Sequence, residues 1–122
     1  MDTSHVCLNV SDADRLAEWY VDELGFEHSW EFTTDDGTTR HVYVTDGDFE
    51  LQLADTDGDD EFDAGTAWNH LAVTVDDVDA AFERIDNHGV VQEPTDNEAA
   101  GARTAFIEDP DGHVVELVAP LS

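Results

Sequence analysis

The order of segments in the first half of the chain is repeated in the second half, and this duplication limits the fold more than any other feature of the sequence. The segments "HVCLNVSDAD" and "HLAVTVDDVD", which start at His5 and His70, have the same residue at four of ten positions: one His, one Val and two Asp. Each half later carries a glutamate followed by leucine, at Glu50 and Glu116. The duplication predicts two copies of one structural module.

The apolar pattern of the first half predicts the element order β-α-β-β-β. An apolar run at 5–10 is typical of a strand, and Ser11 or Asp12 is placed to cap an amphipathic helix that Gly25 ends. Three more strands are expected near 26–33, 40–45 and 49–54, with turns at Asp36-Gly37 and Asp46-Gly47.

The second half repeats this order. A strand at 70–75 precedes Asp76 or Asp77, either of which would cap a helix expected to end at Gly89. Strands near 90–92, 103–107 and 113–118, with a turn at Asp111-Gly112, complete the second module. The sequence therefore predicts a single α+β domain over residues 1–122, made of modules 1–54 and 68–122 that an acidic linker at 55–67 joins.

An extreme excess of acidic residues restricts the environment and the partners. The chain has 31 Asp and Glu against 4 basic residues, all of them Arg, and a formal net charge of -27. Such a chain repels itself less in molar salt, where the screening length falls to about 3 Å, so we expect a halophilic, cytoplasmic protein. Disorder is excluded because 40% of the residues are hydrophobic and fall in periodic segments. Nucleic acid and membranes are excluded as partners, because both require a basic patch or an apolar span.

Two histidines and two glutamates occupy equivalent places in the two modules. His5 and His70 head equivalent strands, and Glu50 and Glu116 follow them by 45 and 46 residues. Each residue alone is more typical of a structural histidine or a solvent-facing glutamate. At duplicated positions, two imidazoles and two carboxylates predict a divalent metal site. The single Cys7 lies in an apolar run and is expected to be buried. The remaining histidines lack the pattern and are expected in surface or capping roles: His28, His41, His88 and His113.

The chain resembles the vicinal oxygen chelate superfamily and, within it, glyoxalase I. The matching stretches are "SHVCLNVSDADRLAEWYVDELGF", "FELQL", "GTAWNHLAVTVDD" and "EDPDGHVVELV", which span nearly the full length. The resemblance implies that the modules form a cupped mixed sheet around a metal. The glyoxalase I ligand order His-Glu-His-Glu corresponds to His5, Glu50, His70 and Glu116. The extradiol dioxygenases of the superfamily are similar but lack the second carboxylate.

What the resemblance implies about activity is isomerisation of the hemithioacetal that methylglyoxal forms with a small thiol. Ni²⁺, Co²⁺ or Zn²⁺ would stabilise an enediolate, and Glu116, with Glu50 as the other candidate, would be the catalytic carboxylate that moves the proton. The resemblance also implies a homodimer with metal ligands from both subunits, which is the usual arrangement in glyoxalases of this length. The alternatives are another enzyme of the superfamily, an acyl-thioester epimerase or a thiol transferase, and a non-catalytic small-molecule-binding protein.

Three departures from the glyoxalase I pattern concern the thiol. Asn9, Ala54 and Glu98 stand where members that use glutathione carry Arg, Asn and Lys. These residues argue against glutathione and leave a different small thiol, or none, open. Arg103 and Trp68 are expected to contact the substrate, with a structural ion pair as the alternative for Arg103 and packing in the core or a subunit interface as the alternative for Trp68.

Overall fold

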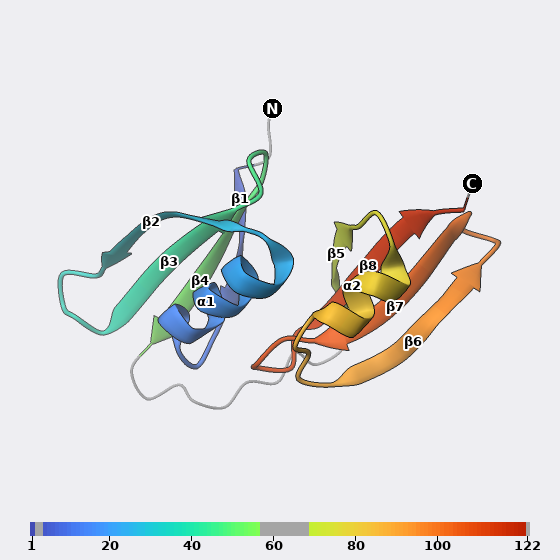
Figure 1. Cartoon of the computed structure of the whole chain (residues 1–122). Coiled ribbons are helices and arrows are strands. Elements are labelled where there is room, and N and C mark those ends of the chain that lie inside the picture. Colours follow the sequence, from blue (N-terminus) through green and yellow to red (C-terminus); the bar gives the residue numbers. More distant parts are fainter. Residues whose placement is uncertain (2–3, 57–68, 122) are drawn as a thin grey trace. The chain divides into compact units, whose positions relative to one another are not determined.

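The computed structural model describes residues 1, 4–56 and 69–121, which belong to two compact units, Met1–Asp63 and Ala64–Ser122 (Figure 1). Most of the linker expected at 55–67 lies outside the described residues. Its first residues, Asp55 and Thr56, belong to a strand, and Asp55 accepts a hydrogen bond at 3.3 Å from the backbone N–H of Ala13. Neither helix of the described part of the chain has the length and hydrophobicity that crossing a membrane would require.

The first unit has the expected order of elements. These are β1 (His5–Asn9), α1 (Ala13–Leu24), β2 (Glu27–Thr33), β3 (Thr39–Thr45) and β4 (Glu50–Thr56). The four strands form one sheet in the order β1-β4-β3-β2, in which β1 runs parallel to β4 and the other pairs are antiparallel. Because a parallel pair needs a crossover connection, α1 lies against one face of this sheet (Figure 1).

Both ends of α1 are where the sequence predicts them. The side chain of Asp12 accepts a hydrogen bond from the backbone N–H of Arg15 at 3.1 Å, which satisfies one free donor of the first turn. Gly25 adopts the left-handed conformation with φ of 75°, and its N–H donates to the carbonyl of Tyr20. The helix buries Leu16 and Tyr20 completely.

Alternation along the strands gives the first sheet two different faces. The side chains of Val42, Val44, Leu51 and Leu53 lie on the face that α1 covers and are almost completely buried. The intervening residues lie on the opposite face, which we call the open face of the first unit. Since strand residues at even spacing share a face, His5 and Glu50 belong to the open face.

The second unit has the same topology and confirms the α+β class with tandem β-α-β-β-β modules. Its elements are β5 (Leu71–Thr74), α2 (Val78–Arg84), β6 (Val90–Asn97), β7 (Ala102–Glu108) and β8 (Val114–Pro120). The sheet order is β5-β8-β7-β6, and β5 is parallel to β8. Asp77 caps α2, as the sequence predicts, by accepting from the backbone N–H of Ala80 at 3.1 Å.

Two expectations for the second unit are wrong. The helix ends at Arg84 rather than at Gly89, because Ile85 turns to an extended conformation with its side chain only 5% exposed. His88 is therefore not at a helix end, and its backbone N–H donates to the carbonyl of Glu108. Strand β6 is longer than expected, because irregular register around Pro94 on this edge strand hides the alternation in the sequence.

Gly25 provides a test of the helix end. A Cβ at this position would meet no atom within 4 Å, so only the backbone conformation opposes a larger residue. We expect Gly25→Ala to lower the free energy of unfolding by about 1 kcal/mol, because a left-handed conformation is costly for an L-residue. Gly25→Asn should lose less, since Asn tolerates this conformation better. Urea denaturation in constant high salt measures both, and equal losses would contradict the assignment.

Candidate functional site

The first predicted pair, His5 and Glu50, lies on neighbouring strands of the first unit. The parallel register of β1 and β4 places the two residues directly opposite each other, and adjacent strands are about 4.8 Å apart. The His5 ring is edge-on to Tyr43, with centroids 5.7 Å apart, and Nδ1 lies 3.1 Å from the hydroxyl of Ser4. His5 is exposed and Glu50 is half-buried. A solvent-accessible imidazole thus stands beside a carboxylate.

The second predicted pair, His70 and Glu116, makes a direct contact in the second unit. Nε2 of His70 lies 3.0 Å from Oε1 of Glu116, whose side chain is 16% exposed. On the other side of the ring, Nδ1 is hydrogen-bonded to the side-chain oxygen of Asn69. The ring is edge-on to Phe106, with centroids 5.3 Å apart.

This geometry fits two ligands of one cation. An oxygen of Asn69 can only accept, so Nδ1 carries the proton, and in a neutral ring Nε2 then directs its lone pair at a carboxylate. Two facing acceptors require a proton or a cation between them. Two ligand atoms about 2.1 Å from one ion and at right angles to each other are roughly 3 Å apart. Hydrogen bonding of the second ring nitrogen is also how metal-bound histidines are commonly oriented.

The two pairs differ in register in a way that the sequence did not reveal. His5 is opposite Glu50, whereas Ala72 is opposite Glu116, so that His70 stands two residues before the matching position. A shift of two keeps each histidine on the same face of its sheet as its glutamate, because strand side chains alternate with period two.

Each unit brings two of the four predicted ligands together. Over residues 4–56 and 69–121, no three His, Cys, Asp or Glu side chains gather in an arrangement that would hold a metal ion. The assembly of the two pairs into one site is a prediction that neither unit tests by itself.

Arg103 takes part in a structural ion pair, which was the alternative expected for it. Its Nε and Nη2 donate to the two carboxylate oxygens of Asp79 at 2.7 and 2.9 Å, and Nη1 donates to Asp96 at 3.0 Å. These hydrogen bonds raise the pKa of Arg103 and lower the pKa of Asp79. Its contact with a substrate stays a prediction. Trp68, the other expected substrate contact, lies outside the described residues.

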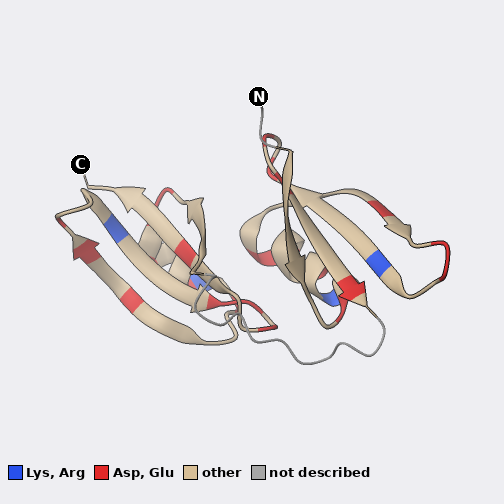
Figure 2. Cartoon of the chain, turned by 180° about the vertical axis from the view of Figure 1, so that it is seen from behind, with Lys and Arg blue, Asp and Glu red and all other residues tan. Residues whose placement is uncertain are grey.

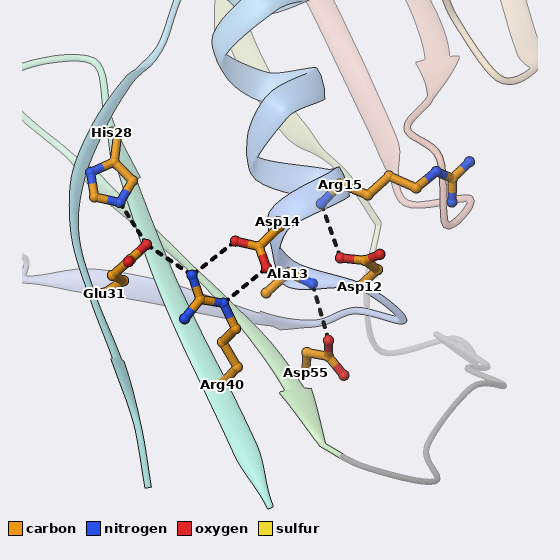
Figure 3. Close-up of polar contacts among 8 residues, drawn as sticks. All are labelled: Asp12, Ala13, Asp14, Arg15, His28, Glu31, Arg40 and Asp55. Carbon is orange, nitrogen blue, oxygen red and sulfur yellow. Dashed lines mark hydrogen bonds and ion pairs between the residues drawn. The ribbon is translucent and has the colours of Figure 1, made fainter. Parts of the chain in front are cut away.

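The first unit contains an equivalent arginine. Nε and Nη2 of Arg40 donate to the two oxygens of Asp14, both at 2.9 Å, and Nη2 also contacts Glu31 at 3.0 Å (Figure 3). Asp14 and Asp79 are the second residues of α1 and α2, so each arginine binds the first turn of its helix to the sheet. Sequence reasoning missed this pair of contacts, although the repeated Asp14 and Asp79 were a signal. Figure 2 shows how few basic residues lie among the acidic ones.

Another histidine differs from expectation. His113 is largely buried, and its Nδ1 lies 2.7 Å from Oδ2 of Asp109, a completely buried carboxylate. Asp109 also accepts from the backbone N–H groups of Asp111 and His113, both at 2.9 Å. The "EDPDGH" segment therefore builds a turn around a buried carboxylate, and the His113 side chain is only 11% exposed rather than on the surface.

The tandem β-α-β-β-β modules define the class of fold, and comparison with known proteins agrees. The model of the Glyoxalase/Bleomycin resistance protein/Dioxygenase superfamily matches residues 3–117, and the chain belongs to this superfamily. A lactoylglutathione lyase of Haemophilus influenzae is 32% identical over 97% of this chain and 92% of its own length. These similarities group the chain with the glyoxalase I-like lyases of the superfamily.

Solved structures show the same fold. The crystal structure of glyoxalase I from Zea mays is 25% identical and superimposes with a TM-score of 0.87 over 99% of this chain, which spans 45% of the maize chain. An antibiotic binding protein from a Streptomyces species is 27% identical, with a TM-score of 0.73 over 98% of this chain and 96% of the other.

The ion pairs of Arg40 with Asp14 and of Arg103 with Asp79 should stabilise their units, and the stabilisation should be larger at low salt than at high salt. We expect Arg40→Gln and Arg103→Gln to lower the Tm, by a larger amount at about 0.1 M than at about 1 M salt, where exposed charges are screened. Arg15→Gln is the matched control, because it removes the same charge from an exposed position of α1. Thermal unfolding followed by circular dichroism measures the shifts, and an equal shift in all three variants would show a general effect of net charge.

The Arg103 contact also predicts a dependence on pH. The pKa of Asp79 lies below its ordinary value of 3.8, chiefly because Arg103 donates hydrogen bonds to it. The stabilisation is therefore present above this value and is lost as the pH falls through the lower pKa of the folded state. The difference in Tm between the native chain and Arg103→Gln should be constant near about pH 6 and narrow below about pH 4. A difference that widens in acid would contradict this assignment.

Proposed function

We propose that the protein is a metal-dependent glyoxalase-type enzyme that converts the hemithioacetal of methylglyoxal and a small thiol into a thioester of lactate. The contact between Nε2 of His70 and Oε1 of Glu116 carries the proposal, because it is an arrangement that a cation stabilises. The equivalent pair of the first unit, His5 and Glu50, would supply a second imidazole and a second carboxylate as metal ligands. The lactoylglutathione lyase of Haemophilus influenzae supports the reaction type.

His5, Glu50, His70 and Glu116 would together hold Ni²⁺, Co²⁺ or Zn²⁺. Two imidazoles and two carboxylates suit these ions and leave two positions of a six-coordinate shell for the substrate. We propose a homodimer in which one pair from each of two subunits completes a site. When bound, the ion supplies electrostatic stabilisation of the enediolate oxygens.

Glu116 is the proposed base. Its carboxylate is mostly buried beside Phe106, a setting in which a charge interacts more strongly with its partners than in water. The carboxylate would take the proton from the thiol-bearing carbon and return it to the neighbouring carbon, while the hydroxyl proton of the first carbon passes to the oxygen of the second. The C–H electron pair becomes the double bond of the enediolate and then the new C–H bond, which leaves a hydroxyl on the second carbon and a thioester carbonyl at the first. Glu50 is the other candidate for this transfer. The half-buried position of Glu50 leaves it accessible to a substrate on the open face.

A second candidate function is binding without catalysis. The likeness to the Streptomyces antibiotic binding protein favours it, because that chain has the same fold over nearly its whole length. Acyl-thioester epimerisation and thiol transfer are further options for a metal-loaded site. We also propose cytoplasmic location and adaptation to high salt, from the net charge of -27.

Metal content is the decisive test. Elemental analysis of protein purified in molar salt should find about one divalent transition ion per chain. His5→Ala, His70→Ala and Glu116→Ala should each lose most of it, because each removes one of four ligands. His88→Ala is the control, since His88 is exposed and its hydrogen bond to Glu108 is made by the backbone N–H, which the substitution keeps.

Turnover should follow the metal. With methylglyoxal and a small thiol, formation of the thioester, followed by its ultraviolet absorbance, should fall by about 10²-fold or more in Glu116→Gln. His88→Ala should retain full activity. Stoichiometric metal without turnover of any aldehyde would favour the binding function, and a chain that takes up no metal after reconstitution would overturn the proposal.

A further inference from the structure

The residue that precedes the proposed ligand histidine differs between the two units. Ser4 precedes His5, and Asn69 precedes His70. Each of these side chains contacts Nδ1 of the histidine that follows it, Ser4 through its hydroxyl at 3.1 Å and Asn69 through its amide oxygen. Equivalent contacts in the two units are thus made by two different chemical groups.

The two groups differ in what they require of the ring. A hydroxyl can donate or accept a hydrogen bond, so Ser4 is compatible with Nδ1 of His5 in either state. An amide oxygen can only accept, so Asn69 requires a proton on Nδ1 of His70. The nitrogen left to bind a cation is then Nε2, which lies 3.0 Å from Oε1 of Glu116. Asn69 therefore selects the nitrogen that faces the carboxylate.

The backbone explains why the second unit needs this contact more than the first. His5 is the first residue of β1 and pairs with Glu50 on β4, so the sheet itself holds its backbone. His70 stands one residue before β5, whose pairing with β8 begins at Leu71. Because His70 lies outside this ladder, the direction of its side chain depends on the contacts of the ring.

The aromatic contact of the His70 ring does not distinguish its two nitrogens from its carbons. Phe106 meets the ring edge-on, with centroids 5.3 Å apart, and is opposite Glu116 on the neighbouring strand. A half turn of the His70 ring about the Cβ–Cγ bond would keep this contact and would put carbon atoms where Nδ1 and Nε2 now lie. The hydrogen bond to Asn69 opposes the turn, because it is lost when a C–H replaces the N–H.

We propose that Asn69 is a positioning residue for the metal, which holds the ring of His70 with Nε2 toward Glu116 before an ion binds. Asn69 acts through His70 rather than as a ligand of its own. This inference rests on the proposed function, because it takes His70 and Glu116 as metal ligands. Outer partners of metal-bound histidines change metal affinity by about 10- to 100-fold. Ser4 lacks this role, because the strand already orients His5.

Affinity for Zn²⁺ is the first measurement, made by competition with a chelator on the full chain in molar salt. All chains carry Cys7→Ser, because Cys7 is exposed, contrary to expectation, and a thiol is itself a zinc ligand. We expect Asn69→Ala to raise the Kd about tenfold or more. Ser4→Ala, the matched control at the equivalent position, should change it less than about threefold. Asn69→Leu, which is similar in size to Asn, replaces Asn69→Ala if that variant does not fold.

A conservative substitution tests the direction of the hydrogen bond. Asn69→Asp keeps an oxygen that only accepts, so it should retain the native Kd or lower it. Because Asp also adds a negative charge, the control adds Asn97→Asp to the Asn69→Ala chain, which gives the same net charge. Asn97 is exposed and is the last residue of β6. This second charge should restore nothing, and equal restoration by both would show an effect of charge alone and overturn the inference.

The position of the ring proton gives a readout that does not depend on the metal. At about pH 8, above the usual titration range of histidine, ¹⁵N NMR of the metal-free chain distinguishes a protonated ring nitrogen from an unprotonated one. We expect the proton of His70 on Nδ1 in the native chain and in Asn69→Asp, and on Nε2, facing Glu116, in Asn69→Ala. A proton on Nε2 alone in the native chain would mean that the amide of Asn69 donates to Nδ1, and would overturn the inference.

The outcomes separate this inference from the proposed function. Zinc bound more weakly in Asn69→Ala and normally in Ser4→Ala, in a protein that turns over no aldehyde, would support the positioning role and overturn the enzyme. Turnover with the same Kd in both variants would overturn the positioning role and leave the enzyme. A lower Tm of metal-free Asn69→Ala, with an unchanged Kd, would identify a purely structural contact and would also overturn the inference.

Discussion

Parallel pairing between the first and the last strand of each unit is the constraint on which the rest of the structure depends. Pairing β1 with β4 requires the chain to cross over the sheet, and α1 makes that crossing and covers one face. The other face is left open. The same pairing brings His5, at the start of the unit, beside Glu50, near its end. The second unit repeats the arrangement with β5 and β8. Fold and candidate ligands therefore have one cause, and a shift of one residue in register would place a histidine and its glutamate on opposite faces.

The placement of the few basic residues follows the division of each sheet into a helix-covered face and an opposite face. A chain with 31 acidic and 4 basic residues has few cations to place, and two of them hold a helix to its sheet. Arginine suits this use, because its planar group binds both oxygens of a carboxylate at once and stays charged at every relevant pH. The contacts of Arg40 and Arg103 are on the helix-covered sides, where they offset repulsion among the surface carboxylates.

Much of the fold follows from the sequence because the duplication allows each half to be checked against the other. Alternation identified the strands, and Asp12 and Gly25 marked the ends of the first helix. The second helix ends earlier than predicted because Ile85 adopts an extended conformation with its side chain in the core. A pattern of apolar residues does not distinguish a buried residue that ends a helix from one that continues it. The His and Glu pairs were predicted from their repeated spacing. The stacking of Trp30 on Tyr43 was not predicted, because the two rings meet only through an irregular register near Trp30 that no local pattern encodes.

The two units carry equivalent pairs of His and Glu, but the residues around the two pairs differ. In the first unit the edge strand places Trp30 against Tyr43, and aromatic surface extends away from His5. In the second unit the edge strand places Gln92 where its amide donates to Thr104 at 3.1 Å, a polar contact. Two copies of one module that keep the same pair of ligands need not keep the same neighbours, because the pairs depend on the parallel strands and the neighbours depend on the edge strand. The parallel strands thus fix the position of the proposed ligands, and the edge strands vary the side chains that lie beside them.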